Sequence, residues 1–73
     1  MARETIEVPI TGKIISVNVK PGDAVKESDV ICTLESMKME NPILSPVDGT
    51  VVEVSVIPDQ VVKPGEKIAV IEY

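Results

Sequence analysis

The sequence contains almost no aromatic side chains, no histidine and one cysteine. Its 73 residues include a single tyrosine and neither phenylalanine nor tryptophan, so a core must be built from valine, isoleucine and leucine, which favours strands. Six prolines leave few uninterrupted windows for a helix. One cysteine excludes an internal disulfide framework. Without histidine or a cluster of metal-binding side chains, so short a chain lacks the inventory of a self-sufficient enzyme. We expect an all-β, non-catalytic domain without a metal.

Basic residues are also scarce. Seven lysines and arginines stand against twelve aspartates and glutamates, giving a net charge of −5. With no basic cluster and no aromatic platform, the composition predicts no nucleic-acid partner, and an anionic membrane surface is an equally poor match. Residues 1–7 lack the apolar stretch of a signal peptide, and no run reaches membrane-spanning length. These absences predict one cytoplasmic domain, residues 1–73, that is monomeric when isolated.

The second half of the chain copies the first at an offset of 37 positions. The half-repeats run from about 9–35 and 46–72, and the matching segments are 9–12 with 46–49, 14–19 with 51–56, and 31–35 with 68–72. A single duplication of this length indicates two copies of one supersecondary unit packed about an approximate two-fold axis. Cys32 aligns with Ala69, which predicts a small core residue and not a reactive thiol.

Each copy shows the pattern of short strands separated by turns. Apolar residues alternate with polar ones, and this predicts that six side chains face the core: Ile15, Val17 and Val19 in the first copy, and Val52, Val54 and Val56 in the second. Compact turns at 20–23 and 57–60 interrupt the strands. About eight short strands result, and this regular spacing predicts a sandwich or a flattened barrel.

One stretch breaks the symmetry of the two copies. Apolar runs at 30–34 and 42–44 meet with almost no connecting residues, which predicts a tight hairpin with Lys38 at its tip, in water. The second copy simply stops at Tyr73, so the tip and the chain ends are expected at opposite ends of the molecule. A lysine amine is mostly protonated at neutral pH and needs an activated acyl donor to react. Lys38 is therefore predicted to accept an acyl group that a separate, dedicated enzyme activates.

The motif Glu-Ser-Met-Lys-Met-Glu-Asn at 35–41, centred between the two copies, resembles the attachment motif of biotin carboxyl carrier proteins and biotinyl domains. The likeness covers nearly the whole chain and includes the Pro-Gly turns at 21–22 and 64–65. It implies a barrel-sandwich hybrid, or flattened β-barrel, of two four-stranded antiparallel sheets. It also implies that a biotin protein ligase attaches biotin covalently to Lys38 through an amide, using ATP.

The resemblance further implies a carrier that shuttles a carboxyl group between a biotin carboxylase and a carboxyltransferase. The carrier contributes none of the bond-making groups; its effect is effective concentration. Because the half-repeats align without a gap from 9 to 35, the chain lacks the thumb insertion of bacterial acetyl-CoA carboxylase carriers. It is more similar to biotinyl domains of transcarboxylases, acyl-CoA decarboxylases, and pyruvate or propionyl-CoA carboxylases.

The residues around Lys38 are assigned roles by this motif. Met37 and Met39 flank a two-residue turn, so we expect them to be partly exposed and recognised by the ligase and the partner enzymes. Glu35, Ser36 and Glu40 complete the flanking motif, although Glu72 aligns with Glu35 without any modification site beside it. A solvent-facing or structural role is therefore preferred for Glu35.

Two other functions remain open at this point. A lipoyl carrier domain of a 2-oxoacid dehydrogenase-type complex shares the expected fold and also acylates a hairpin lysine, but usually within an Asp-Lys-Ala triplet. An unmodified barrel-sandwich module that serves only protein contacts would not need an exposed lysine framed by methionines.

Overall fold

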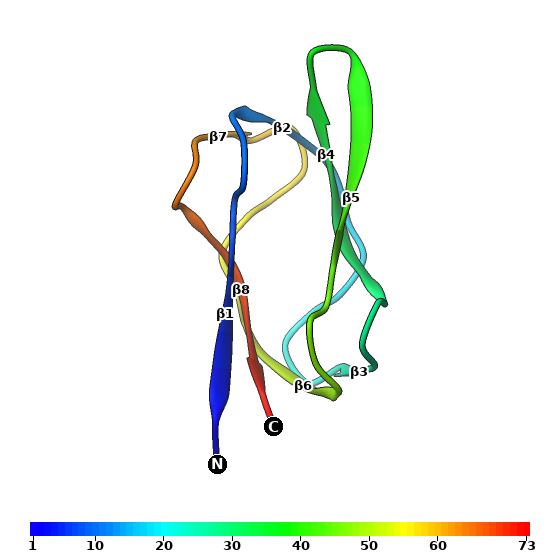
Figure 1. Ribbon diagram of the computed structural model, residues 1–73, viewed down its shortest axis with the longest axis vertical. Helices are drawn as coiled ribbons and strands as arrows, with labels where there is room; N and C mark the ends of the chain where they lie inside the picture. Colours follow the sequence, from blue (N-terminus) through cyan, green and yellow to red (C-terminus); the bar gives the residue numbers. More distant parts are fainter.

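The computed structural model describes all residues, 1–73. It contains eight strands and no helix (Figure 1): β1 (Arg3–Glu7), β2 (Gly12–Val17), β3 (Ala24–Val25), β4 (Val30–Ser36), β5 (Met39–Leu44), β6 (Gly49–Val54), β7 (Val61–Val62) and β8 (Lys67–Glu72). No helix is present that could cross a membrane.

The strands form two four-stranded sheets, ordered β1-β8-β6-β3 and β5-β4-β2-β7, and every pairing is antiparallel. No strand pairing joins one sheet to the other, so the molecule is a sandwich of two sheets and not a closed barrel. The predicted all-β class with two four-stranded antiparallel sheets is confirmed.

An approximate two-fold axis relates the sheets. Adding 37 to a residue number carries β1, β2, β3 and β4 onto β5, β6, β7 and β8, and it converts one sheet order into the other. The register follows the same rule, because the Glu4–Ile71 pair of one sheet corresponds to the Asn41–Leu34 pair of the other. The symmetry therefore includes β1 and β5, which lie outside the segments matched by sequence.

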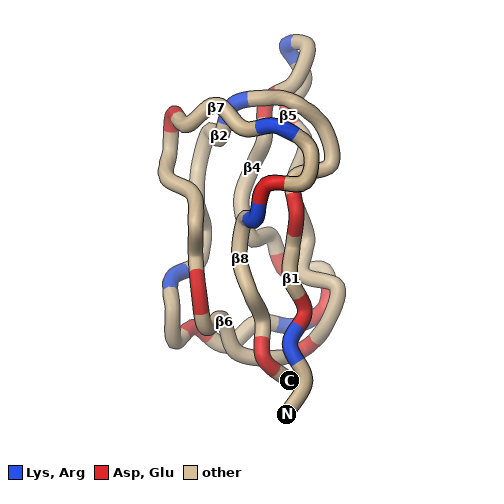
Figure 2. Tube along the Cα trace, turned by 90° about the vertical axis from the view of Figure 1, so that its left-hand side faces the viewer, with Lys and Arg blue, Asp and Glu red and all other residues tan.

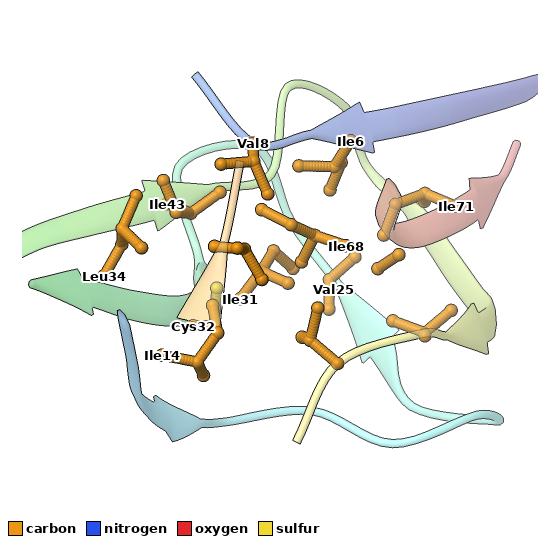
Figure 3. Packing of buried hydrophobic residues seen from close by; sticks show 14 residues of the cluster. Ile6, Val8, Ile14, Val25, Ile31, Cys32, Leu34, Ile43, Ile68 and Ile71 are labelled. Atoms are coloured by element: carbon orange, nitrogen blue, oxygen red, sulfur yellow. The ribbon is translucent and has the colours of Figure 1, made fainter. Parts of the chain in front are cut away.

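The core lies between the sheets and is built almost entirely from aliphatic side chains (Figure 3). Fully buried isoleucines, valines and one leucine come from both sheets, led by Ile14, Ile31, Leu34, Val51, Val62, Ile68 and Ile71. Each such side chain contributes roughly 1.5–3 kcal/mol relative to exposure. Cys32 is buried among them, as predicted, and desolvation raises the pKa of its thiol to about 11.

A β-bulge changes which residue of β2 enters the core. Ile14 is fully buried, whereas Ile15, predicted to face the core, is 38 % exposed. The register between β2 and β4 shifts after Ile14, and the extra residue of a bulge turns the following side chain to the other face. The same shift follows Val51 in β6, so Val51 and not Val52 is fully buried. The predictions for Ile15 and Val52 are wrong for this reason. The other four lie in or against the core: Val17, Val19, Val54 and Val56.

Two symmetry-related glycines allow the strands to approach closely. A Cβ on Gly12 would collide with the backbone oxygen of Glu35 and the side chain of Leu34. A Cβ on Gly49 would meet the equivalent atoms of Glu72 and Ile71. The absence of a side chain at Gly12 thus lets β2 lie against the last part of β4, just below the turn that follows it.

The molecule is elongated, with principal extents of 36 × 18 × 17 Å. The turn between β4 and β5 projects at one end of the long axis, and the N- and C-termini lie together at the opposite end (Figure 1). This arrangement confirms the prediction that the tip and the chain ends are far apart.

Candidate functional site: the hairpin tip

The turn between β4 and β5 contains only two residues. Pairing continues up to Ser36 and Met39, so Met37 and Lys38 alone form the connection. Their φ angles are 54° and 64°, and positive φ at both central positions is the signature of a type I′ turn, the tight hairpin geometry that suits the twist of paired strands. Glycine and asparagine are favoured there, because other residues carry a cost of about 1–2 kcal/mol in this region. The protein retains methionine and lysine despite this cost.

The side chain of Lys38 is exposed and stands apart from other charged groups. The three ion pairs of the structure join Arg3 with Glu72, Lys13 with Asp59, and Lys67 with Glu53, and none involves Lys38. Figure 2 shows a basic position isolated on the turn that protrudes beyond β4 and β5. No ion pair holds the Lys38 amine against the fold, so it is accessible from outside the molecule.

Both methionines are exposed, as expected. Met37 is 92 % and Met39 67 % accessible to solvent. Methionine so exposed contributes little to the core, and its flexible thioether suits contacts with partner proteins. The exposure therefore favours recognition over packing for these two residues, and their recognition role stays a prediction.

Two glutamates lie opposite each other at the base of the turn. Glu35 of β4 pairs with Glu40 of β5, and both are exposed. The pair next to a two-residue turn is hydrogen-bonded, so the following pair, Glu35 with Glu40, belongs to the closely spaced non-hydrogen-bonded type. Like charges directly opposite each other in a sheet are destabilising. The exposed position of Glu35 agrees with the solvent-facing role predicted for it, and Ser36 beside it is half-buried.

The equivalent position in the other sheet is neutralised. There Glu72 faces Arg3, and the Arg3 Nε lies 3.4 Å from Glu72 Oε2. The two copies thus have the same backbone pairing at this position, but one has a Glu–Glu pair and the other has an Arg–Glu ion pair.

Asn41 was not assigned a role from the sequence, although it belongs to the motif. It is half-buried, and its side-chain amide donates a hydrogen bond to the Met39 carbonyl (3.2 Å) and a longer one to the Leu34 carbonyl (3.5 Å). The amide therefore ties β5 to β4 directly below the turn. The available signal was alternation along β5, because Asn41 lies two residues before the buried Ile43 and must point inward.

These features define a class of protein. A rigid sandwich presents one unpaired lysine at the end of a tight hairpin, with exposed methionines beside it and no nucleophile–base pair nearby. Such a domain has the features of a carrier, which presents one side chain to other proteins or domains.

The chain belongs to the biotin/lipoyl attachment family described as "Biotin-requiring enzyme", whose sequence model matches residues 4–71. It is 58 % identical over 40 residues to the glutaconyl-CoA decarboxylase gamma subunit of Acidaminococcus fermentans, covering 55 % of this chain and 28 % of that protein. It is 54 % identical over 33 residues to the human mitochondrial propionyl-CoA carboxylase alpha chain, covering 45 % of this chain and 4 % of that protein. The chain thus spans less than a third of the length of these relatives.

Solved structures show the same fold. A single-chain, multi-domain long-chain acyl-CoA carboxylase matches with a TM-score of 0.87 and 26 % identity, covering 93 % of this chain and 7 % of the other. The urea carboxylase of Kluyveromyces lactis matches with a TM-score of 0.90 and 25 % identity, over 99 % of this chain and 6 % of the other. The predictions of a biotin-family domain, of biotin as the covalent group and of a non-catalytic carrier role are confirmed at the level of the family.

Proposed function

We propose that the chain is a biotin carrier in which Lys38 is the attachment residue. The observation that carries the proposal is the isolation of this lysine: it is exposed, makes no ion pair and occupies one of two strained positions in the turn. A lysine that served only to close the hairpin would be replaced there by glycine at a gain in stability. The fit between residue and group is good, because an amide on an exposed amine disturbs no contact of the fold.

Attachment uses only the amine of this chain. The deprotonated amine of Lys38 attacks an acyl carbon that a biotin protein ligase has activated with ATP; a C–N amide bond forms, the bond to the leaving group breaks, and the amine gives up a proton. The amide removes the positive charge and leaves the four-carbon stem of lysine as a flexible spacer. Bound biotin supplies a ring that accepts a carboxyl group at one site and releases it at another.

The chain's own contribution to transfer is positional. Because the hairpin extends the long axis of a 36 Å domain, the tip enters an active site while the body of the sandwich stays outside. A tethered group does not escape to bulk solvent, which raises its effective concentration at each site it visits. Met37 and Met39 are proposed to contact the ligase and the partner enzymes, with Glu35, Ser36 and Glu40 as the flanking surface.

The proposed partners are a biotin protein ligase, a biotin carboxylase and a carboxyltransferase. Similarity to decarboxylase gamma subunits and to carboxylase alpha chains supports an assembly of the acyl-CoA decarboxylase or carboxylase type. The gapless alignment of the half-repeats, without a thumb, supports the same assignment. We place this function in the cytoplasm, on the basis of the sequence composition.

The experiment that tests this function is intact-mass measurement after co-expression with a biotin ligase. The parent is expected to gain the mass of one biotinyl group, Lys38→Arg is expected to gain none, and both are expected to give the same circular dichroism spectrum. Lys26→Arg, in another exposed turn, is the matched control and should be modified like the parent. Modification of Lys38→Arg would refute the assignment of the residue, and a lipoyl gain with a lipoate ligase alone would assign the chain to the lipoyl carriers.

A further inference from the structure

The outer face of the sheet that contains the hairpin carries a row of four exposed residues level with the base of the turn. Consecutive pairings across β5, β4, β2 and β7 place Glu40 beside Glu35, Glu35 beside Lys13, and Lys13 beside Val61. Directly paired residues point to the same face of a sheet, and all four are exposed. At a strand spacing of about 4.8 Å the row is about 14 Å wide. We name it the tip-side row.

The other sheet contains an equivalent row at the opposite end of the molecule. The same pairings across β1, β8, β6 and β3 align four residues that we name the distal row: Arg3, Glu72, Thr50 and Ala24. Each residue of the distal row differs by 37 from its counterpart in the tip-side row, so the two rows share one backbone arrangement. Any difference between their side chains is therefore not required by the fold.

The rows differ first in charge. In the distal row, Glu72 is neutralised by Arg3. In the tip-side row, the Lys13 side chain is paired with Asp59, with 3.6 Å between Nζ and Oδ1, and neither Glu35 nor Glu40, which lie opposite each other, makes an ion pair. An uncompensated carboxylate pair is matched best by a basic group from outside the chain.

The rows differ also in apolar exposure. Val61 is 69 % exposed, and its counterpart in the distal row is Ala24. Ile57 lies in the turn before β7, and this turn is held against β2 by a hydrogen bond from the Asp59 amide to the Ile14 carbonyl. Ile57 is 68 % exposed, and its counterpart at the other end is Lys20. Exposed branched aliphatic residues are therefore present beside the tip-side row and absent from the same positions at the other end. An apolar edge next to two unpaired carboxylates is a combination expected of a protein-binding surface.

We propose that the tip-side row, together with Ile57, is the surface on which the biotin protein ligase docks, through a basic group opposite Glu35 and Glu40 and an apolar contact opposite Val61 and Ile57. The proposal rests on the function proposed above. Unmodified lysine reaches only about 6 Å from its backbone. The ligase must therefore approach the turn closely and meet the surface below it. The modified side chain is longer, so enzymes that use it are able to stay farther from this surface.

The symmetry of the chain supplies variants that the fold already accepts. The swap set replaces each residue by its distal counterpart: Glu40→Arg, Val61→Ala and Ile57→Lys. The reverse set makes the opposite exchanges at the other end: Arg3→Glu, Ala24→Val and Lys20→Ile. Glu7→Arg, on an exposed position of the other sheet, changes the net charge by the same amount as Glu40→Arg.

The measurement is kcat/KM for ligase-catalysed biotinylation of each purified chain, with thermal unfolding to verify the fold. We expect the swap set to lower kcat/KM about tenfold or more, mainly through KM, whereas the reverse set and Glu7→Arg stay within twofold of the parent. The parent's kcat/KM should fall as ionic strength rises, and Glu40→Arg should weaken this dependence.

The outcomes separate the two proposals. A parent chain that is not biotinylated refutes the proposed function itself. A parent that is modified on Lys38, with a swap set that equals the parent, overturns the docking surface and leaves the function intact. A parent that sediments as a dimer, with a monomeric swap set, assigns the surface to a second copy of the chain and overturns the ligase as its occupant.

Discussion

The two ends of the molecule share one arrangement of strands, and the backbone differs between them in how the paired strands are joined. At one end, Ser36 and Met39 pair and a two-residue turn joins them. At the other end, Tyr73 and Ala2 occupy the equivalent positions, offset by 37, and exchange two backbone hydrogen bonds of 2.9 Å, but no turn connects them. At the termini, therefore, the strands stay paired to their last residues without a turn between them.

This comparison explains why the turn tolerates unfavourable residues. Because the equivalent strands pair at the termini without a turn, we infer that strand pairing and not the turn sequence holds this end together, and that a cost of about 1–2 kcal/mol per turn residue is tolerated there. The equivalent of Lys38 at the other end is Met1, which is almost fully exposed. One copy of the unit carries the proposed attachment residue, and the other copy has no lysine at the equivalent position.

The largest expected effect tests whether the two copies are equally constrained. Gly12→Ala and Gly49→Ala should each lower the free energy of unfolding by about 3 kcal/mol or more, because a Cβ at either position meets backbone oxygen. Gly22→Ala is the control: it has positive φ but open space around it, so it should cost only about 1 kcal/mol. Urea unfolding measures all three free energies. A small loss at only one of Gly12 and Gly49 would show that the two copies are not equally constrained.

The next effect concerns the turn itself. Replacing the two turn residues by Met37→Asn and Lys38→Gly gives the sequence that a type I′ turn prefers, and it should raise the free energy of unfolding by about 1–2 kcal/mol while abolishing biotinylation. Urea unfolding and intact mass measure the two results. If the free energy of unfolding does not rise, the residues of the turn are not strained, and the two ends do not differ in backbone strain.

A smaller effect is expected at Cys32, whose counterpart in the other copy is Ala69. Cys32→Ala should cost about 1 kcal/mol, since it removes one buried sulfur atom. Burial raises the pKa of the Cys32 thiol from an ordinary 9.0 to about 11, so the unfolded chain ionises first. The stabilisation that the neutral thiol provides is complete below pH 9 and is lost as the pH rises toward 11. The free energies of unfolding of the parent and of Cys32→Ala should therefore approach each other as the pH rises from 7 to 11. A constant difference between them would contradict the raised pKa of the Cys32 thiol.

The smallest effect lies on the outer face of the sheet with the termini. A hydrogen bond from Lys67 (Nζ to Oε2, 2.6 Å), and a second from the Ser55 hydroxyl, lower the pKa of Glu53. A lowered pKa in the folded chain stabilises it above the ordinary carboxyl pKa, and this stabilisation is lost as the pH falls through the folded value. Glu53→Gln should therefore lower Tm slightly at pH 7, with a difference that disappears in acid and shrinks in high salt. A Tm difference that persists in acid would show that the ion pair is not its cause.

Most of the fold was predictable from the sequence because the repeat and the alternation report on packing directly. They predicted about eight short strands in a sandwich or flattened barrel and an exposed turn with its methionines, whereas the division into two four-stranded sheets was implied by the family resemblance. They did not give the side-chain directions at Ile15 and Val52, because a bulge depends on how two distant strands pair and leaves no local pattern. The hydrogen bonds of the Asn41 amide and the lack of an ion pair at Glu35 and Glu40 were not predictable either, since both depend on which residues lie opposite in the neighbouring strand.

The pairing of Ala2 with Tyr73 also gives the domain a mechanical direction. A force that separates the chain ends breaks the hydrogen bonds of this pair first and then those of the β1–β8 pairs one after another. Only one or two hydrogen bonds therefore resist the force at any moment. A force between the Lys38 tip and the termini runs along the 36 Å axis and nearly parallel to the long strands (Figure 1), and it loads many rungs at once in shear. We therefore expect the domain to resist a pull on its tip better than a pull that separates its two chain ends.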